Sequence, residues 1–434
     1  MNETQSNVCF VTLGCAKNEV DTNNMKQLVL DAGYSIVEDP EAAQAVVINT
    51  CTFIQSATEE SIDSIFELAG LPSLSNGEAK LIIAGCMPAR YGSDLEDELT
   101  EADAFLPCAQ EKNIVDLLNN LIGPAKANVP LDDQALCHAA SQYVKISDGC
   151  NRFCSYCTIP YIRGRYHSFT YEQIRKDVVT ALSRGAGEIV LIAQDTGRWG
   201  DDFEEPLSLA WLMDSLASEF KETWFRVMYL QPEGITDELL QVMAKHKNIC
   251  SYLDIPLQHV DEQILKAMNR KGSEEEFVAL IEHIKEVIPD VTLRTTLIAG
   301  FPGETDEQFE ALCDFVDEGY FDYVGVFAYS QEDGTRAAKL EDQIDEDEKN
   351  DRAQRVRDLA DAVCIPRVAE RVGQTVQVLI EGIEEDGQLF GRAQCQAPEV
   401  DGVIYVEDAE IGSIVNVTIT DTLLYEMEGE LVNE

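Results

Sequence analysis

The feature that most constrains the fold is a repeated pairing of a short apolar run with a helix-forming segment. Three runs rich in β-branched residues occupy residues 8–13, 45–48 and 80–84, and each ends in a turn followed by a helical pattern. Such runs are typical of buried parallel strands, so residues 1–125 are predicted to form an N-terminal parallel α/β domain. Residues 126–142 show little periodicity and are predicted to be a linker.

A second series of the same kind begins at Tyr143. Its candidate strands are residues 144–147, 188–193, 224–229, 250–255, 291–298 and 323–328. Helical patterns lie between them, and Thr170 with Gln173 and Thr305 with Gln308 have the spacing of a capping box. Six units are too few for a closed eight-stranded barrel, so residues 143–366 are predicted to form a partial (βα)6 barrel or an open parallel sheet.

The last segment, residues 367–434, alternates apolar and polar residues between glycine-containing turns, which predicts a small all-β barrel of about five strands. It carries three basic residues (Arg367, Arg371 and Arg392) against fifteen acidic ones, a net charge of −12. The whole chain has 32 Lys and Arg against 80 Asp and Glu, a net charge of −48. This charge disfavours nucleic-acid and anionic membrane partners and favours a basic one, although it also fits plain solubility or a salty cytoplasm.

Several classes of protein are excluded by what the sequence lacks. No apolar run is long enough to span a membrane, and the first residues do not have the basic-then-apolar pattern of a secretory signal. We therefore expect a cytoplasmic protein, in which thirteen cysteines indicate buried thiols and metal ligands rather than a disulfide framework. No P-loop and no HExxH motif occurs, so neither P-loop nucleotide hydrolysis nor zincin proteolysis is supported.

Cys150, Cys154 and Cys157 lie in the stretch DGCNRFCSYC, directly after a predicted strand. The spacing CxxxCxxC puts three thiolates on one loop. Structural zinc sites and ferredoxin clusters normally use four protein ligands. Three thiolates instead suit a 4Fe–4S cluster whose fourth iron is left open to an exogenous ligand.

Cys15, Cys51 and Cys86 form a second constellation, because each follows an apolar run: VTLGC, INTC and IIAGC. In a parallel sheet all three would reach the same carboxyl edge, near helix N-termini that favour a thiolate. Converging thiols from distant parts of the sequence suit a second metal cluster.

CxxxCxxC at the end of the first strand of a βα series resembles the signature of the radical S-adenosyl-L-methionine (SAM) enzymes, over about residues 143–357. The resemblance implies that SAM chelates the open iron and is cleaved to a 5′-deoxyadenosyl radical. It places Tyr156 near the adenine, with simple loop packing as the alternative. Gln194 and Asp195 after the second strand, and Arg294 on the fifth, are expected to contact SAM, with helix capping as the alternative.

The whole chain resembles the methylthiotransferases, a radical SAM family, through GCAKNEVD (residues 14–21), NTCTFI (residues 49–54), Gly85–Cys86, the CxxxCxxC motif and a terminal TRAM-type barrel. The resemblance implies two 4Fe–4S clusters: one held by Cys150, Cys154 and Cys157, and one held by the three N-terminal cysteines that carries the sulfur to be inserted. GCAKNEVD, FIQSATEESIDSI (residues 53–65) and APEVDG (residues 397–402) resemble the branch that methylthiolates the β-carbon of an aspartate in small-subunit ribosomal protein twelve.

This reading implies a basic ribosomal protein as substrate, an electron donor such as flavodoxin or ferredoxin, no membrane partner and no tight nucleic-acid binding. Two alternatives remain: a methylthiotransferase acting on tRNA adenosine, and a non-catalytic iron–sulfur redox module.

His167–Ser168–Phe169 departs from the Ser-Arg pair common in related sequences. His259 is expected to be a hydrogen-bonded core residue rather than a pocket residue. Buried free thiols are the default for the remaining cysteines, which are Cys9, Cys108, Cys137, Cys250, Cys313, Cys364 and Cys395.

Overall fold

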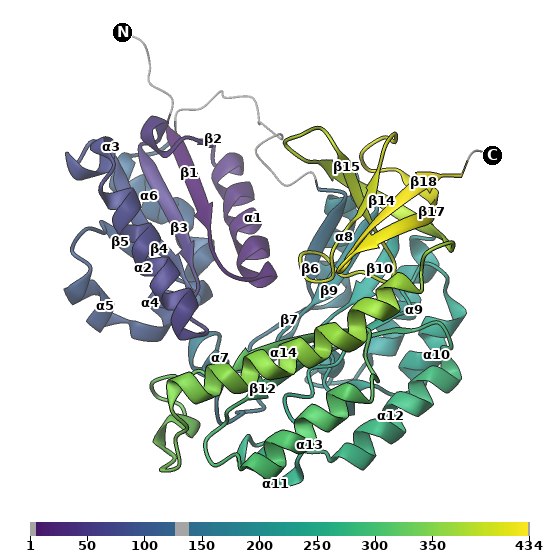
Figure 1. Cartoon of the computed structure of the whole chain (residues 1–434). Helices are drawn as coiled ribbons and strands as arrows, with labels where there is room; N and C mark the ends of the chain where they lie inside the picture. The colour runs from purple at the N-terminus through teal and green to yellow at the C-terminus, as the bar shows by residue number, and fades with distance from the viewer. Residues whose placement is uncertain (1–5, 126–138, 433–434) are drawn as a thin grey trace. The chain divides into compact units, whose positions relative to one another are not determined.

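The computed structural model describes residues 6–125 and 139–432 (Figure 1). These residues form two compact units, each with its own sheets and core. The first contains residues 6–125 together with Gly149–Asn151 and Cys157–Tyr166, and the second contains residues 139–148, 152–156 and 167–432. Residues 126–138 of the predicted linker lie outside the described part of the chain, and its last two residues already belong to a strand.

The first unit is built on five parallel strands in the order β2-β1-β3-β4-β5, which is the flavodoxin-like order. The strands are β1 (Asn7–Thr12), β2 (Ser35–Val37), β3 (Ala45–Thr50), β4 (Lys80–Gly85) and β5 (Ala104–Pro107). The helices are α1 (Ala16–Asp31), α2 (Gln55–Ala69), α3 (Pro72–Ser75), α4 (Cys86–Tyr91), α5 (Ser93–Glu98) and α6 (Ile114–Ile122), with 3-10 turns η1 (Pro40–Ala42) and η2 (Cys108–Asn113).

Both faces of this sheet are buried, which is why its strands read as continuous apolar runs. Successive residues of β3 point to opposite faces: Ala45 and Val47 pack with α1 and α6, whereas Val46 and Ile48 pack with α2, α4 and α5. The predicted α/β layering of this region is therefore confirmed.

The second unit begins with six parallel strands: β6 (Ser141–Lys145), β9 (Glu188–Ile192), β10 (Trp224–Val227), β11 (Tyr252–Asp254), β12 (Thr292–Ala299) and β13 (Tyr323–Ala328). They form two three-stranded sheets, and a parallel bridge between Phe225 and Ile249 joins β10 to the chain entering β11. The connections are α8 (Tyr171–Ser183), α9 (Leu209–Glu219), α10 (Asp237–Lys245), α11 (Glu262–Ala267), α12 (Glu274–Val287), α13 (Asp306–Asp317), α14 (Glu346–Ala369), η4 (Thr196–Arg198), η5 (Pro232–Gly234), η6 (Ala337–Lys339) and the short pair β7 (Ser147–Asp148) and β8 (His167–Ser168).

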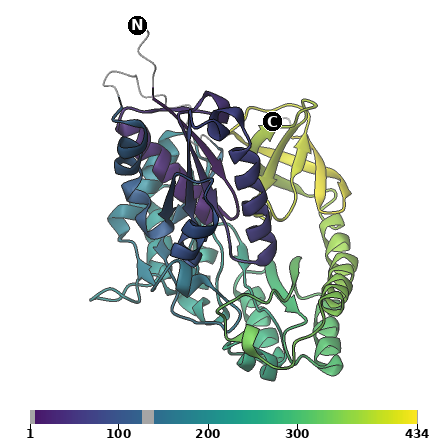
Figure 2. The ribbon, with the colours of Figure 1, turned by 90° about the vertical axis from the view of Figure 1, so that its left-hand side faces the viewer.

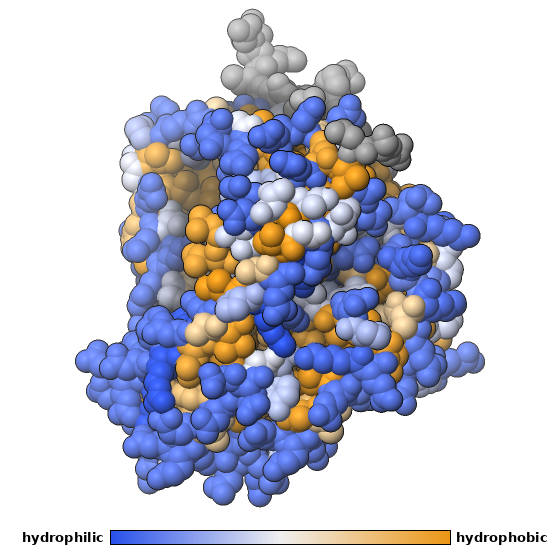
Figure 3. Space-filling model, turned by 45° about the vertical axis from the view of Figure 1, so that its right-hand side comes forward, coloured by the Kyte–Doolittle hydropathy of each residue, from blue (hydrophilic) through white to orange (hydrophobic). Residues whose placement is uncertain are grey.

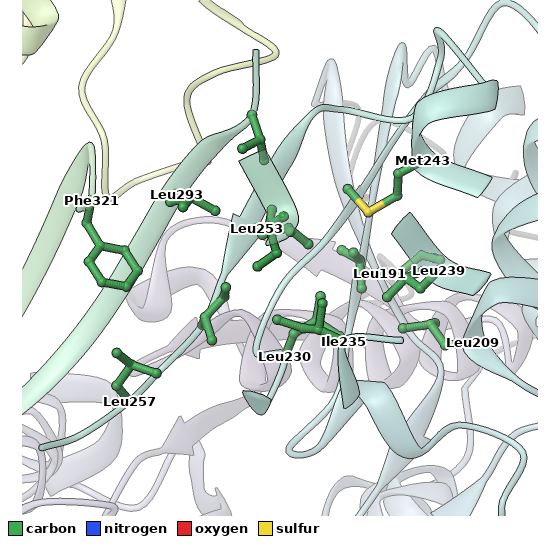
Figure 4. Packing of buried hydrophobic residues seen from close by; sticks show 14 of the residues in the cluster. Leu191, Leu209, Leu230, Ile235, Leu239, Met243, Leu253, Leu257, Leu293 and Phe321 are labelled. Atoms are coloured by element: carbon green, nitrogen blue, oxygen red, sulfur yellow. The ribbon is translucent and has the colours of Figure 1, made fainter. Parts of the chain in front are cut away.

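Sequential strands are thus neighbours, as a partial (βα)6 barrel requires. Both predicted capping boxes are present, at the start of α8 and of α13. Leucines from the strands and from the surrounding helices fill the space between them, as Leu191, Leu209, Leu239 and Leu253 illustrate in Figure 4. Among the described helices, none is long and apolar enough to cross a membrane.

The chain ends in a closed five-stranded barrel in the order β14-β15-β16-β18-β17. Its strands are β14 (Thr375–Ile383), β15 (Leu389–Ala393), β16 (Ile404–Val406), β17 (Ile414–Leu423) and β18 (Glu426–Leu431). Helix α14 leads from the (βα)6 part of the second unit into this barrel, as Figure 2 shows. The predicted small all-β barrel is confirmed.

The barrel belongs to the second unit and is joined to it by buried ionic contacts. Arg392 of β15 lies 2.6 Å from Glu188, the first residue of β9. Asp401 of the barrel accepts a hydrogen bond of 2.5 Å from Tyr252 and lies 3.4 Å from Arg294. Glu188 and Tyr252 begin their strands, so the barrel docks near the amino ends of the strands, away from the carboxyl edge.

Candidate iron–sulfur sites

The register of the first sheet sets cysteines side by side at its carboxyl edge. Thr50 of β3 pairs with Gly85 of β4, so Cys51 and Cys86, the next residues, leave neighbouring strands at the same level. Thr12 of β1 pairs with Asn49, which puts Cys15 one residue beyond the level of Cys51. The sheet therefore brings the three predicted N-terminal cysteines to one edge. In this strand order the switch between β1 and β3 is where ligands bind.

Two glycines allow this edge to form. Gly14 has a φ of +89°, and a Cβ added there would lie 2.4 Å from Cβ and 2.8 Å from Sγ of Cys51. Gly85 has a φ of +94°, and its added Cβ would lie 2.1 Å from Oδ1 of Asn49. Only glycine fits such close approaches. At each glycine the chain passes from a strand to a helix, and the next residue is a cysteine, Cys15 after Gly14 and Cys86 after Gly85.

Asn18, buried at the start of α1, links the three strand ends. Its Nδ2 donates to the carbonyl oxygens of Leu13 at 2.9 Å and Thr50 at 3.0 Å. Its Oδ1 accepts a contact of 3.7 Å from Sγ of Cys86. One side chain of the GCAKNEVD stretch thus ties the residues around all three cysteines.

Ser61 of α2 fixes the second cysteine in a similar way. Its Oγ donates to the carbonyl of Cys51 at 2.8 Å and accepts from the backbone N–H of Cys51 at 3.1 Å. The FIQSATEESIDSI stretch therefore supplies the helix that holds the Cys51 backbone.

Arg163 brings a positive charge to this group. Its Nη1 lies 2.9 Å from Asp21, and its Nη2 donates to Oδ1 of Asn18 at 2.9 Å and contacts Sγ of Cys86 at 3.9 Å. The side chains of Arg163 and Asp21 are 3% and 1% exposed. A buried guanidinium is thus held against a cysteine by a buried carboxylate.

The thiols at this edge influence one another electrostatically. Burial raises the pKa of Cys86, Arg163 lowers it, and the neighbouring thiols Cys108, Cys51 and Cys15 raise it. Burial also raises the pKa of Cys51, and Cys15 adds to that effect. The thiolate forms therefore need positive charge nearby. A coordinated metal ion supplies that charge, and the thiols that bind it lose their protons.

Among residues 6–125 and 139–432, no three His, Cys, Asp or Glu side chains converge closely enough to hold one metal ion. A 4Fe–4S cluster makes a different demand, because each thiolate binds its own iron and the ligands spread around the cluster. Three electrostatically coupled thiols beside a closely approached glycine and a buried guanidinium fit such a group. The ligand role of Cys15, Cys51 and Cys86 stays a prediction.

Cys150, Cys154 and Cys157 lie on the loop between β7 and α7 (Ile159–Ile162). In the first unit, the N–H of Cys150 donates to the carbonyl of Gly164 at 3.2 Å. Gly149 has a φ of +74°, and a Cβ there would lie 2.4 Å from the carbonyl oxygen of Arg165. The turn before the first cysteine of the motif therefore requires glycine.

The middle of this loop is held by the second unit. Nδ2 of Asn269 donates to the carbonyls of Arg152 at 2.8 Å and Phe153 at 3.1 Å, and Nη2 of Arg336 donates to Phe153 at 2.7 Å. Phe153 adopts a φ of +51°, a left-handed conformation that this carbonyl anchoring sustains. The backbone around Cys154 is thus fixed by hydrogen bonds from two separate segments.

Two of the four residues predicted to contact SAM are Tyr156 and Gln194. Tyr156 packs beside the buried group of Ile264, Met268, Phe301, Tyr329 and Ala337. The amide nitrogen and oxygen of Gln194 are both buried, and no described residue hydrogen-bonds to them. Such groups are rarely left unpaired in native proteins, so the Gln194 amide is free to bind a ligand.

The other two have protein partners. Asp195 accepts hydrogen bonds from Arg152 at 2.6 and 3.2 Å. Arg294 is the third residue of β12, and it pairs with Asp254 at 3.2 Å and with Asp401 of the barrel at 3.4 Å. Its position near the amino end of the strand is far from the carboxyl edge where ligands of βα barrels bind. Contact of these residues with SAM stays a prediction.

Sequence reasoning missed Asn18, Asp21 and Arg163 as site residues, and it treated Cys108 as an ordinary buried thiol. The sequence around Cys108 offers only a weak signal, the four-residue apolar run AFLP that it directly follows. Arg163 and Asn18 are 145 residues apart, and nothing in their local sequence indicates the contact.

Three family models match this chain. The model of the radical SAM superfamily matches residues 144–316, that of "Uncharacterized protein family UPF0004" matches residues 7–107, and that of the TRAM domain matches residues 372–432.

Curated relatives match over nearly the full length. The ribosomal protein uS12 methylthiotransferase RimO of Natranaerobius thermophilus is 40% identical, over 98% of this chain and 99% of the relative. The protein of the same name from Trichlorobacter lovleyi is 38% identical over the whole of both chains.

The solved structure of the radical SAM methyltransferase TsrM from Kitasatospora setae has a TM-score of 0.53 at 14% identity. The match covers 75% of this chain and 77% of that one. This likeness shows the fold alone.

Proposed function

Because the chain belongs to the family of ribosomal protein uS12 methylthiotransferases, we propose that it replaces a hydrogen on the β-carbon of an aspartate in uS12 with a methylthio group. The observation that carries this proposal is the presence of two separate cysteine triads. Cys15, Cys51 and Cys86 share one sheet edge, and the CxxxCxxC loop follows the first strand of the (βα)6 part. The proposed cofactors are two 4Fe–4S clusters and SAM.

In this proposal each triad holds one cluster. When bound, a cluster chelated by SAM supplies a radical able to take a hydrogen atom from an unactivated C–H bond. The residues of the chain hold the loop and the cosubstrate: Asn269 and Arg336 fix the backbone beside Cys154, and the Gln194 amide offers a donor and an acceptor to SAM. At the other triad, Asn18 and Arg163 orient Cys86.

The barrel favours a basic protein as substrate. From residue 375 to residue 434 the only basic residue is Arg392, and it is buried. Eleven carboxylates of the described barrel are exposed: Glu384, Glu385, Asp386, Glu399, Glu407, Asp408, Glu410, Asp421, Glu426, Glu428 and Glu430. Figure 3 shows hydrophilic residues over much of one face of the molecule, with hydrophobic areas between them. Such a surface attracts basic proteins and releases no counterions from RNA.

Iron content and SAM cleavage test the two triads. After anaerobic reconstitution we expect about eight irons per chain, because two 4Fe–4S clusters are bound. Cys150→Ala should remove one cluster and abolish SAM cleavage. Cys51→Ala should remove the other, spare SAM cleavage and stop sulfur insertion. About four irons in the wild-type protein would contradict the proposal.

The mass of uS12 from cells with and without this gene tests the reaction. We expect the added methylthio group only when the gene is present. Modification of tRNA with unmodified uS12 would favour the tRNA alternative, and the absence of SAM cleavage would favour a redox module. A flavodoxin or ferredoxin as electron donor and a cytoplasmic location complete the proposal.

A further inference from the structure

A fourth cysteine stands in the row at the edge of the first sheet. Pro107, the last residue of β5, pairs in register with Gly85, the last residue of β4. Cys86 and Cys108 therefore follow a matched pair, as Cys51 and Cys86 do. Three neighbouring parallel strands, β3, β4 and β5, thus each deliver a cysteine at the same level.

Contacts around Cys108 place its thiol beside the same group. Sγ of Cys108 donates to the carbonyl of Ile162 at 3.5 Å, and the next residue, Arg163, contacts Sγ of Cys86. Among the thiols that act on the pKa of Cys86, Cys108 has a larger effect than Cys51 or Cys15. Cys108 is also half-buried rather than enclosed.

A 4Fe–4S cluster with a complete set of protein ligands uses four cysteines. Cys15, Cys51 and Cys86 supply three. We propose that the thiolate of Cys108 is a reversible fourth ligand of the N-terminal cluster, bound until the sulfur to be inserted displaces it. This inference rests on the proposed function, because it needs both that cluster and an incoming sulfur.

The contact between Sγ of Cys108 and the carbonyl of Ile162 corresponds to the state in which sulfur has displaced Cys108 from the cluster. A carbonyl oxygen accepts a hydrogen bond only from the protonated thiol, so Ile162 stabilises Cys108 when it is not bound to iron. In the exchange, the iron–sulfur bond to Cys108 breaks and a bond to hydrosulfide forms. Hydrogen sulfide supplies both the hydrosulfide and the proton that goes to Cys108, and no electron is transferred.

The test uses the full-length chain with Cys150, Cys154 and Cys157 replaced by alanine, which leaves only the N-terminal site to load. We expect about four irons per chain in this background, as one 4Fe–4S cluster requires. If no cluster forms, both the proposed function and this inference fail. If the cluster forms, the following measurements test Cys108 alone.

Iodoacetamide alkylation, read by peptide mass spectrometry, reports whether Cys108 is bound. We expect Cys108 to be protected in the loaded protein, and to react after sodium sulfide is added and after iron is removed. Equal alkylation of the loaded protein with and without sulfide overturns the inference.

Electron paramagnetic resonance of the reduced cluster provides an independent readout during a sulfide titration. In Cys108→Ala, sulfide no longer competes with a protein ligand, so the half-saturating concentration should fall by roughly tenfold, equivalent to about 1.4 kcal/mol. Cys9→Ser is the matched control, because Cys9 lies within β1 and its Sγ contacts the carbonyl of Glu38. A Cys108→Ala spectrum and titration equal to those of Cys9→Ser overturn the inference.

Discussion

Replacing Arg392 with methionine is expected to destabilise the second unit by about 3–5 kcal/mol, the usual cost of breaking a buried ion pair from one side. The Arg392 side chain is 2% exposed, and its Nη2 lies 2.6 Å from both Glu188 and Glu381. Methionine fills much of the same space but cannot pair with Glu188, which is 1% exposed. Arg226 at 2.8 Å then remains as the only cation beside that carboxylate among the described residues.

The magnitude follows from the carboxylate itself. Burial alone raises the pKa of Glu188, but Arg226 and Arg392 outweigh it and lower the pKa from 4.5 to about 2. Each pKa unit corresponds to about 1.4 kcal/mol, so the two arginines together exceed the cost of burying the carboxylate by about 3 kcal/mol. Their combined contribution is larger than this net value, and the loss of one arginine leaves the burial cost in place. Because the folded pKa is below the unfolded one, this stabilisation is present above pH 4.5 and is lost as the pH falls towards 2.

Urea unfolding followed by circular dichroism measures the loss. Arg355→Met is the matched control, because Arg355 and its partner Glu310 are each 51% exposed and such pairs contribute at most about 1 kcal/mol. Adding Glu188→Gln to Arg392→Met should restore part of the stability, since the unpaired buried charge is removed. A loss below about 1 kcal/mol for Arg392→Met would refute the reasoning.

Three further predictions concern other sites. Because burial lowers the pKa of His259 to about 4, stability should fall by about 3 kcal/mol as the pH drops from 6.5 to 4. His259→Gln should remove that fall in urea titrations whereas the exposed control His283→Gln should keep it, and an identical pH profile in all three proteins would contradict the prediction. Replacing the exposed Glu384, Glu385 and Asp386 with lysine should weaken uS12 binding measured by calorimetry, and the effect should grow as the salt concentration falls. The control replaces the exposed Glu282, Glu286 and Asp290 with lysine and should leave binding unchanged. Equal effects of the two sets would argue against the barrel as the binding surface. Arg163→Gln should lower the reduction potential of the N-terminal cluster, since a positive charge beside Cys86 is removed and the carboxylate of Asp21 stays, and an unchanged potential at full iron content would exclude that role.

The two α/β regions could be predicted because their strands are buried on both faces. All nine predicted strands are present, and β3, with every residue buried, shows why a continuous apolar run is a sufficient signal. The short strands β2 and β5, of three and four residues, gave too little pattern to recognise. Missing β5 also hid the position of Cys108 in the row of cysteines.

Contacts between distant segments could not be predicted. Arg392 was counted only as one of three basic residues of the barrel, yet it lies 204 residues from its partner Glu188 and is buried with it.

The docking of the barrel onto the rest of the second unit also affects which experiment best tests its role in substrate binding. Deleting residues 367–434 would leave Glu188 and Tyr252 without their barrel partners, so surface substitutions separate substrate binding from stability more cleanly.

Helix α14 runs from the carboxyl edge of the (βα)6 strands to the barrel, so its length gives a distance between these two parts of the second unit (Figure 1). Near one end, Arg352 pairs with Glu304, which follows β12, and the helix ends at Ala369 just before the barrel. At 1.5 Å per residue the two points are roughly 25 Å apart, which an extended peptide of about eight residues just spans. A substrate fragment shorter than this, with its aspartate at the carboxyl edge beside Arg352, cannot reach the end of α14 where the barrel begins. Short uS12 peptides should therefore react independently of barrel charge, and only longer ones should acquire its salt dependence.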